Sequence, residues 1–211
     1  MRIVASGAPL ASARAAAVLV HGRGGSAEDM LGLAEELGQR DIAYFAPEAP
    51  GRTWYPYSFL APLQQNAPHL SNALATVGAT LDRLAQEGFP AERVALIGFS
   101  QGGCLALEYV ARNARRYGAV GGLSAGLIGP PGTPRNYAGA LGGTPVFLGC
   151  SDVDSHIPLA RVHESREVFE KMGAEVTERI YPGMGHTVNH DEIAHVASLL
   201  ASLATTPAAS P

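Results

Sequence analysis

A serine in a glycine-flanked turn is the first group in the chain with the setting of a nucleophile. The stretch Gly98-Phe99-Ser100-Gln101-Gly102 follows the apolar run 94–97 and precedes a predicted helix. On such a tight turn a serine hydroxyl stands clear of the sheet, and the glycines avoid a Cβ collision across the turn. The pattern predicts a nucleophile at Ser100. The alternative is an ordinary serine cap at the start of a helix.

Acidic residues and a histidine follow two later apolar runs. Asp152 and Asp154 come after the run 145–148, and His186 lies in a glycine-rich loop after the run 176–181. A histidine can take the proton of a serine hydroxyl, and a carboxylate can orient that histidine. The order serine, aspartate, histidine is the order of the α/β-hydrolase fold. His156, beside the aspartates, is the other candidate base, and the aspartate pair could also form turns.

A glycine-rich turn, His21-Gly22-Arg23-Gly24-Gly25, follows the apolar run 15–20. Such a turn lets the backbone approach a reacting carbonyl. The backbone N–H groups of Arg23 and Gln101 can then point at one oxygen and form an oxyanion hole. A phosphate-binding loop is disfavoured, because the glycine spacing and the lysine of such loops are missing. His21 itself ends the strand, and we interpret it as structural.

These candidate residues all follow short apolar runs that alternate with helical segments. The runs are continuously apolar, which is typical of strands buried on both faces of a parallel sheet. Ligands of such sheets bind at the carboxyl ends of the strands. The predicted strands are 15–20, 42–46, 94–97, 119–123, 145–148 and 176–181. The predicted helices are 27–37, 70–86, 101–115, 159–172 and 192–203. The fold class is therefore α/β, with a mostly parallel sheet and helices on both faces.

The chain resembles the small carboxylesterase/phospholipase family of α/β hydrolases, which includes the acyl-protein thioesterases. The resemblance spans about residues 15–203 and rests on four motifs. They are Leu19-Val20-His21-Gly22, Gly98-Phe99-Ser100-Gln101-Gly102-Gly103, the loop from Asp152 to Pro158, and Gly183-Met184-Gly185-His186. It implies a single α/β-hydrolase domain without a lid, a triad of Ser100, Asp154 and His186, and an oxyanion hole at Arg23 and Gln101. Asp152 stays the alternative acid, since Ser155 stands where the family has proline.

Two departures point to a bacterial branch of this family. Acyl-protein thioesterases mostly have leucine at the position of Arg23, and they lack the aromatic stretch within residues 47–59. Protein depalmitoylation is therefore not carried over. Trp54, Tyr55 and Met184 are the predicted substrate-binding residues, because they follow strands at the site end of the sheet and could form an apolar wall. Residues 124–144 are too few for a lid domain, so we expect an open site.

Composition excludes several classes of protein. A formal net charge of −4 argues against a nucleic-acid binder, which needs an excess of lysine and arginine. The apolar runs are too short for a membrane helix, and the first ten residues do not form a signal peptide. The two cysteines fit buried positions. We expect a cytoplasmic protein without cofactor or metal, with one domain at 1–204 and a tail at 205–211; a homodimer stays open.

The sequence thus predicts a serine hydrolase that cleaves carboxylic esters of short to medium acyl chains. A small-molecule ester is the expected partner. Thioesters and lysophospholipids are the alternative substrates for the same triad. The remaining alternative, from another class, is a binding protein without activity on a hydrolase scaffold, because a fold alone does not fix a function.

Overall fold

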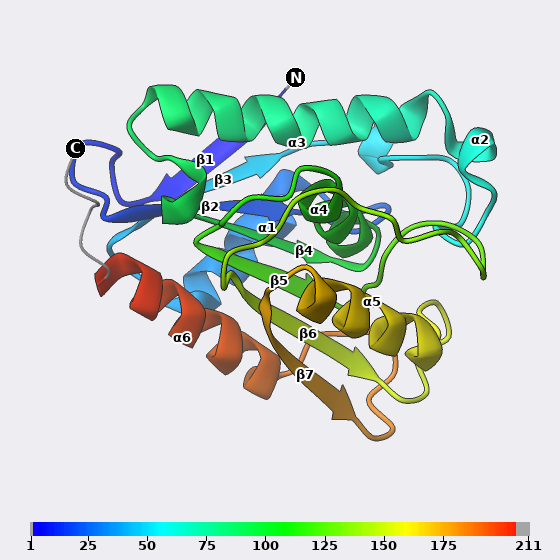
Figure 1. The fold of residues 1–211 in the computed structure, drawn as a ribbon. Helices are drawn as coiled ribbons and strands as arrows, with labels where there is room; N and C mark the ends of the chain where they lie inside the picture. Colours follow the sequence, from blue (N-terminus) through cyan, green and yellow to red (C-terminus); the bar gives the residue numbers. More distant parts are fainter. Residues whose placement is uncertain (1, 206–211) are drawn as a thin grey trace.

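Seven strands form one sheet in the computed structural model, which describes residues 2–205 (Figure 1). Their order is β1-β3-β2-β4-β5-β6-β7. Only β1 runs antiparallel to its neighbour, β3, and the other pairs are parallel. The strands are β1 (Ile3–Gly7), β2 (Ala15–Val20), β3 (Ile42–Pro47), β4 (Val94–Phe99), β5 (Ala119–Leu123), β6 (Pro145–Ser151) and β7 (Glu175–Tyr181).

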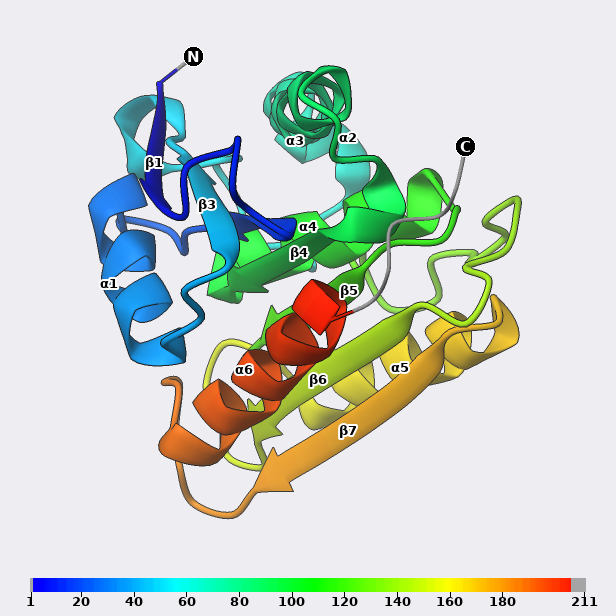
Figure 2. The same cartoon turned by 90° about the vertical axis from the view of Figure 1, so that its left-hand side faces the viewer.

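Helices cover both faces of the sheet. They are α1 (Ala27–Leu37), α2 (Leu63–Asn66), α3 (His69–Gln86), α4 (Ser100–Arg112), α5 (Leu159–Lys171) and α6 (His190–Thr205), with short 3₁₀ turns η1 (Pro50–Arg52) and η2 (Ala91–Arg93). Helices α1 and α6 pack on one face, and α3, α4 and α5 on the other (Figure 2). The result is the three-layer arrangement that a parallel sheet requires.

Alternate residues of the central strands feed two apolar cores, one on each face. In β2, Val18 points to the core beneath α3, α4 and α5, and Leu19 to the core beneath α1 and α6. In β4, Leu96 and Ile97 divide in the same way. Successive side chains of a strand point to opposite faces, so a strand buried on both faces must be apolar throughout. This burial explains the continuous apolar runs in the sequence.

The predicted fold class is confirmed, and the six predicted strands and five predicted helices are present. Helix α1 has the predicted bounds, because Ser26 and Asp29 form a reciprocal capping box and Gly38 ends the helix at φ +65°. Strand β1 and the short helix α2 were not predicted from the sequence. Thr205, expected in the tail, ends α6, and residues 206–211 of that tail lie outside the described part of the chain.

Residues 124–144 connect β5 to β6 without forming a helix or strand. In Figure 1 this connection passes beside α4 and α5. Its first residues, 124–129, are buried. The connection therefore packs onto the body of the molecule, as the absence of a lid domain predicts.

Candidate active site

Ser100 lies at the junction of β4 and α4 with a left-handed backbone angle, φ +54°. The turn leaves no room for side chains on either side of it. A Cβ on Gly98 would lie 2.4 Å from the carbonyl oxygen of Gly102, and a Cβ on Gly102 would lie 2.2 Å from that of Val20. Positive φ is costly for a residue with a side chain, so the packed glycines on both sides hold Ser100 in this conformation. The turn presents the hydroxyl at the carboxyl end of the sheet.

Three side chains form an unbroken chain of hydrogen bonds at this edge. Nε2 of His186 lies 2.8 Å from Oγ of Ser100, and Nδ1 of His186 lies 2.7 Å from Oδ2 of Asp154. They come from the ends of three parallel strands, β4, β6 and β7. The geometry lets the imidazole accept the proton of the serine hydroxyl while the carboxylate receives the Nδ1–H.

The environment of Asp154 keeps its carboxylate ionised. Burial alone would raise its pKa, but hydrogen bonds from His186 and from two backbone N–H groups lower the pKa below its usual value. Those N–H groups belong to His156 and Ile157, and they lie 2.8 and 3.0 Å from Oδ1. The thiol of Cys150 also faces Oδ2, at 3.7 Å. Burial and the nearby Asp154 charge raise the pKa of Cys150 to about 12, so this thiol stays protonated.

Asp152 has a different partner. Its Oδ1 accepts the backbone N–H of Gly183 at 2.8 Å, and the hydroxyl of Ser151 accepts that of Gly185 at 3.0 Å. Both bonds tie the glycine-rich loop before His186 to the end of β6. The structure thus brings Asp154 to the histidine ring and places Asp152 under the loop that carries the histidine.

The two predicted oxyanion donors lie on either side of Ser100. A Cβ on Gly22 would be 3.3 Å from Cβ of Ser100, so the glycine-rich turn after β2 packs against the serine. Gln101 is the second residue of α4, and its backbone N–H therefore has no acceptor within the helix. Within residues 2–205, no hydrogen bond uses the backbone N–H of Arg23. Both groups are available to a developing negative charge at the start of a helix.

The side chain of Arg23 turns away from the serine and binds the aromatic segment, defined here as residues 53–59. Its guanidinium donates to the carbonyl oxygens of Pro56 and Tyr57 at 3.0 and 2.8 Å. Next to it, the N–H of Gly24 donates to the carbonyl of Arg52 at 2.8 Å. The turn that carries the predicted oxyanion donor therefore also holds this segment.

Gln101 binds the same segment from the other side. Its amide oxygen accepts the backbone N–H of Trp54 at 3.0 Å, and its amide nitrogen donates to the carbonyl of Tyr55 at 2.8 Å. The indole N–H of Trp54 donates to the carbonyl of His21 at 2.9 Å, and the two rings pack with centroids 5.0 Å apart. The ring of His21 is buried and accepts the N–H of Ala49, which fits its structural interpretation.

A cavity of about 550 Å³ opens beside Ser100 and His186. Its rim consists of exposed residues, among them Arg23, Tyr57 and His156. Its floor consists of buried residues that are apolar or nearly so. The floor residues are Tyr55, Phe59, Cys104 and Ile157. The cavity thus joins a polar catalytic end to an apolar interior.

The predicted substrate-binding residues differ in their relation to this cavity. Tyr55 lines it, whereas Trp54 lines a second hollow between the aromatic segment and α3. Met184 is half-buried in the histidine loop, where its sulfur accepts the side-chain N–H of Asn189, and it is not part of the lining. The aromatic segment is irregular, so residue spacing does not tell which way each side chain points. The sequence therefore could not predict that Tyr55 lines the cavity and that its neighbour Trp54 does not.

Sequence reasoning missed several residues around the triad. The ring of Phe99, which was not singled out, lies 5.1 Å from that of His186, whereas His156, the alternative base, packs edge-on against the His186 ring at 4.7 Å. Cys104 could have been found, because it lies one helical turn after Ser100 on the same face of α4. Ile157 carried no comparable signal, since its place depends on how the loop after β6 folds.

Two features are absent from residues 2–205. No helix in this range is long and apolar enough to cross a membrane. No group of three or more histidine, cysteine or acidic side chains in the same range is arranged to hold a metal ion.

Residues 3–204 match the sequence profile of the Phospholipase/Carboxylesterase family. A solved phospholipase/carboxylesterase from Dyadobacter fermentans is 44% identical, with a TM-score of 0.91 over 95% of this chain and 96% of its own. Acyl-protein thioesterase 1 of Saccharomyces cerevisiae is 25% identical over 92% of this chain and 94% of its length. The Bacillus cereus carboxylesterase, at 19% identity and a TM-score of 0.75, covers 96% of this chain and 94% of its own and shares the fold. The chain belongs to the phospholipase/carboxylesterase family of α/β hydrolases.

Proposed function

We propose that this family member is a serine hydrolase that cleaves carboxylic esters of short to medium acyl chains through an acyl-enzyme. The observation that carries the proposal is the hydrogen-bonded chain of Ser100, His186 and Asp154 at the mouth of a cavity with an apolar floor. The polar end supports acyl transfer, and the floor supports an apolar acyl group.

In the first step Oγ of Ser100 attacks the ester carbonyl carbon, and its proton passes to Nε2 of His186. The carbonyl electrons move onto oxygen, and the backbone N–H groups of Arg23 and Gln101 hold that oxyanion. When the intermediate collapses, His186 returns the proton to the departing alkoxide, and the alcohol leaves. Asp154 stabilises the imidazolium throughout by accepting its Nδ1–H.

In the second step water takes the place of the alcohol. His186 accepts a proton from water while the oxygen attacks the acyl carbon of the serine ester. The second oxyanion occupies the same two N–H groups. Its collapse breaks the bond to Ser100, whose oxygen regains the proton from His186, and the carboxylic acid is released.

Hydrolysis of p-nitrophenyl acetate and butyrate tests this proposal. We expect Ser100→Ala to lower kcat by about 10⁶-fold, because the triad acts as a unit. Ser155→Ala is the matched control, since Ser155 is exposed and lies outside the proposed machinery. Retention of substantial activity by folded Ser100→Ala would contradict the nucleophile. A wild type that binds these esters without cleaving them would favour the binding-protein alternative.

Thioester hydrolysis is the second candidate, favoured by the relatives named acyl-protein thioesterase in Saccharomyces cerevisiae and Debaryomyces hansenii. The triad and oxyanion donors would serve a thioester through the same two steps. The ratio of kcat/KM for butyryl thioester and butyryl p-nitrophenyl ester separates the two. A ratio well above one would make thioesters the preferred substrates. Lysophospholipids, which are glycerol esters of medium to long acyl chains, are tested by the same measurement of kcat/KM.

A further inference from the structure

Buried apolar residues, Phe59 among them, line the cavity beside the nucleophile. Cys104 continues the face of α4 that carries Ser100, and Phe59 and Ile157 complete the buried apolar surface. An acyl chain attached to Ser100 would extend along this surface. What lies behind Phe59 therefore decides how long that chain can be.

A buried arginine lies there. The guanidinium carbon of Arg161 is 5.8 Å from the ring centroid of Phe59, and the residue is 4% exposed. Arg161 belongs to α5, which begins two residues after Ile157, so the arginine and a floor residue come from one continuous segment. The backbone N–H of Gly129 also donates to the carbonyl of Phe59 at 2.8 Å, which fixes the floor from the same side.

Fixed partners hold the Arg161 guanidinium in place. It donates to the carbonyl oxygens of Leu127 and Gly129, both at 2.6 Å, and pairs with Oε2 of Glu164 at 2.7 Å. A Cβ on Gly126 would lie 2.7 Å from Cγ of Arg161, so the stem of the arginine is also tightly packed. Unlike a methionine or leucine in this position, the side chain cannot swing aside without leaving buried polar groups unpaired.

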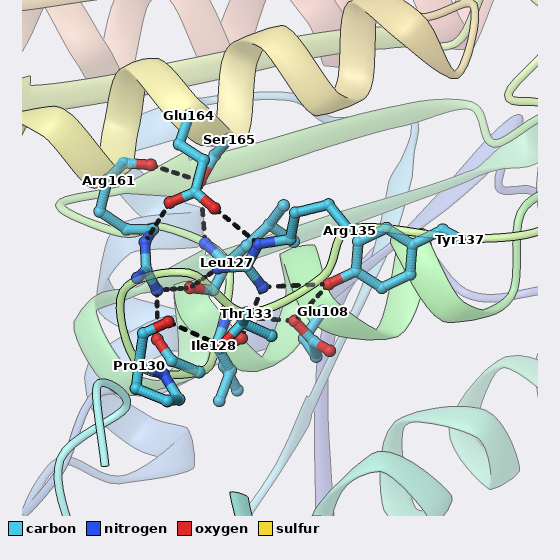
Figure 3. A network of polar contacts seen from close by, with 11 residues as sticks. Glu108, Leu127, Ile128, Pro130, Thr133, Arg135, Tyr137, Arg161, Glu164 and Ser165 are labelled. Carbon is cyan, nitrogen blue, oxygen red and sulfur yellow. Dashed lines mark hydrogen bonds and ion pairs between the residues drawn. The ribbon is translucent and has the colours of Figure 1, made fainter. Parts of the chain in front are cut away.

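A wider network extends this rigidity (Figure 3). The other oxygen of Glu164 pairs with Arg135 at 2.8 Å, and Arg135 donates to the Tyr137 hydroxyl at 3.3 Å. That hydroxyl donates to buried Glu108 of α4 at 3.1 Å, and Glu108 also accepts the N–H of Ile128 at 3.0 Å. The network thus joins α4, α5 and the connection after β5 into one body behind the floor.

We infer that Arg161 ends the acyl pocket and acts, through Phe59, as a positioning residue that restricts the proposed esterase to short acyl chains. A chain end that passed Phe59 would have to displace the Arg161 guanidinium from its carbonyl and carboxylate partners, which would leave those buried groups unpaired. The inference rests on the proposed ester hydrolysis. It predicts that acetyl, butyryl and similar esters are hydrolysed with a higher kcat/KM than octanoyl and longer esters.

The first test uses a series of p-nitrophenyl esters from acetate to decanoate. We expect wild-type kcat/KM to fall at least about tenfold between hexanoate and decanoate, since a misfitted methylene costs a hydrophobic pocket that much or more. Arg161→Met keeps the length of the side chain but removes its charge and donors. It should raise the decanoate-to-butyrate ratio at least about tenfold, because methionine can adapt to a longer chain.

Arg166→Met is the matched control on the same helix. Its guanidinium is half-exposed and lies 4.0 Å from Glu178 of β7, away from the floor. This variant should keep the wild-type ratio. Circular dichroism and thermal unfolding establish that each variant is folded, and an unchanged decanoate-to-butyrate ratio in folded Arg161→Met would overturn the inference.

A second variant leaves the network intact and tests the position of the charge. Phe59→Ala should uncover the Arg161 guanidinium at the end of the pocket. A p-nitrophenyl glutarate monoester would then place its carboxylate against that charge. We expect its kcat/KM relative to the neutral pentanoate to rise at least about tenfold in Phe59→Ala and to stay unchanged in the rim control Tyr57→Ala.

The outcomes separate this inference from the proposed function. If wild type cleaves no ester in the series, the proposed function fails. If wild type cleaves butyrate but folded Arg161→Met or folded Phe59→Ala leaves the acyl profile unchanged, only the pocket inference fails.

Discussion

Two aspartates after β6 bind different partners, although a single residue separates them. Asp154 accepts from the ring of His186, whereas Asp152 accepts from the backbone N–H of Gly183. The first bond fixes a tautomer and the second fixes a loop. Only the bond to His186 requires a carboxylate, because an amide in its place could donate to Nδ1 and so favour the other tautomer of the ring.

We therefore expect Asp154→Asn to lower kcat by roughly 10⁴-fold, because an amide favours the wrong tautomer of His186. Asp152→Asn should cost less than about tenfold, since an asparagine oxygen can still accept the Gly183 N–H. Steady-state kinetics with p-nitrophenyl butyrate measures both. The reverse ranking would move the acid role to Asp152.

Glu192 is a buried carboxylate near the start of α6. One oxygen accepts the backbone N–H of Asn189 at 2.8 Å, and the other has no hydrogen-bonding partner among residues 2–205. Burial raises the pKa of Glu192 to about 7, with a smaller contribution from the charge of Asp191. The ionised form is therefore disfavoured in the folded protein.

This shift predicts a pH dependence of stability. Because the folded pKa lies above the ordinary value of 4.5, the protein loses stability as pH rises from about 5 to 7, by about 2 kcal/mol. Glu192→Gln has no proton to lose, so its unfolding free energy relative to wild type should increase over this range. Urea unfolding at pH 5, 6 and 7 measures the difference, and a constant difference would contradict the raised pKa.

At the scale of elements, the aromatic segment is held by the same turn and helix that carry the proposed oxyanion donors. Arg23→Met removes both side-chain bonds to this segment while keeping the backbone N–H. We expect kcat/KM for butyrate to fall about tenfold, which corresponds to about 1.4 kcal/mol for two solvent-exposed hydrogen bonds. Arg23→Lys, which keeps one donor site, should recover part of the loss.

Arg52→Met is the control for Arg23. Arg52 is also exposed and next to the segment, but it contributes a backbone carbonyl to Gly24 that the substitution keeps. Its kinetics should match wild type. Equal losses in Arg23→Met and Arg52→Met would show that general charge near the rim matters and that the specific bonds do not.

The bounds of helices and strands could be predicted from the sequence where they depend on capping residues or on burial of a strand on both faces. The apolar run of β2 and the capping residues of α1 are local signals, because each is contained in the element or lies next to it. Both elements have the predicted bounds. Strand β1 is partly exposed and pairs only along one edge, so its residues carry no comparable pattern.

The candidate site divides in the same way. Ser100 and His186 lie in glycine-rich turns that the sequence displays directly. Arg161 lies behind the floor residue Phe59 through the packing of α5 and the connection after β5, which no local pattern specifies.

At the scale of the whole molecule, the candidate site is open to solvent. The connection between β5 and β6 packs against α4 and α5 through the network around Glu164 and does not cover the cavity. An enzyme without a cover needs no lipid interface to expose its site.

We therefore expect no interfacial activation. The rate of tributyrin hydrolysis should follow one hyperbolic curve through the solubility limit of the substrate. A pH-stat assay measures the rate at tributyrin concentrations below and above its solubility limit. Vinyl butyrate, kept below its own solubility limit, is the control. A sharp rise in rate when droplets form would contradict the open site.

The path of the chain divides the candidate site into two consecutive halves. Ser100 and both proposed oxyanion donors precede the exposed turn at Pro131 and Gly132, and Asp154 and His186 follow it. The first half carries β1 to β5, and the second carries β6 and β7, which lie together at one edge of the sheet. Cutting the chain at this turn would give two fragments, neither with a complete triad. Ester cleavage would then report their reassembly, which makes the fold a natural scaffold for a split reporter of protein proximity.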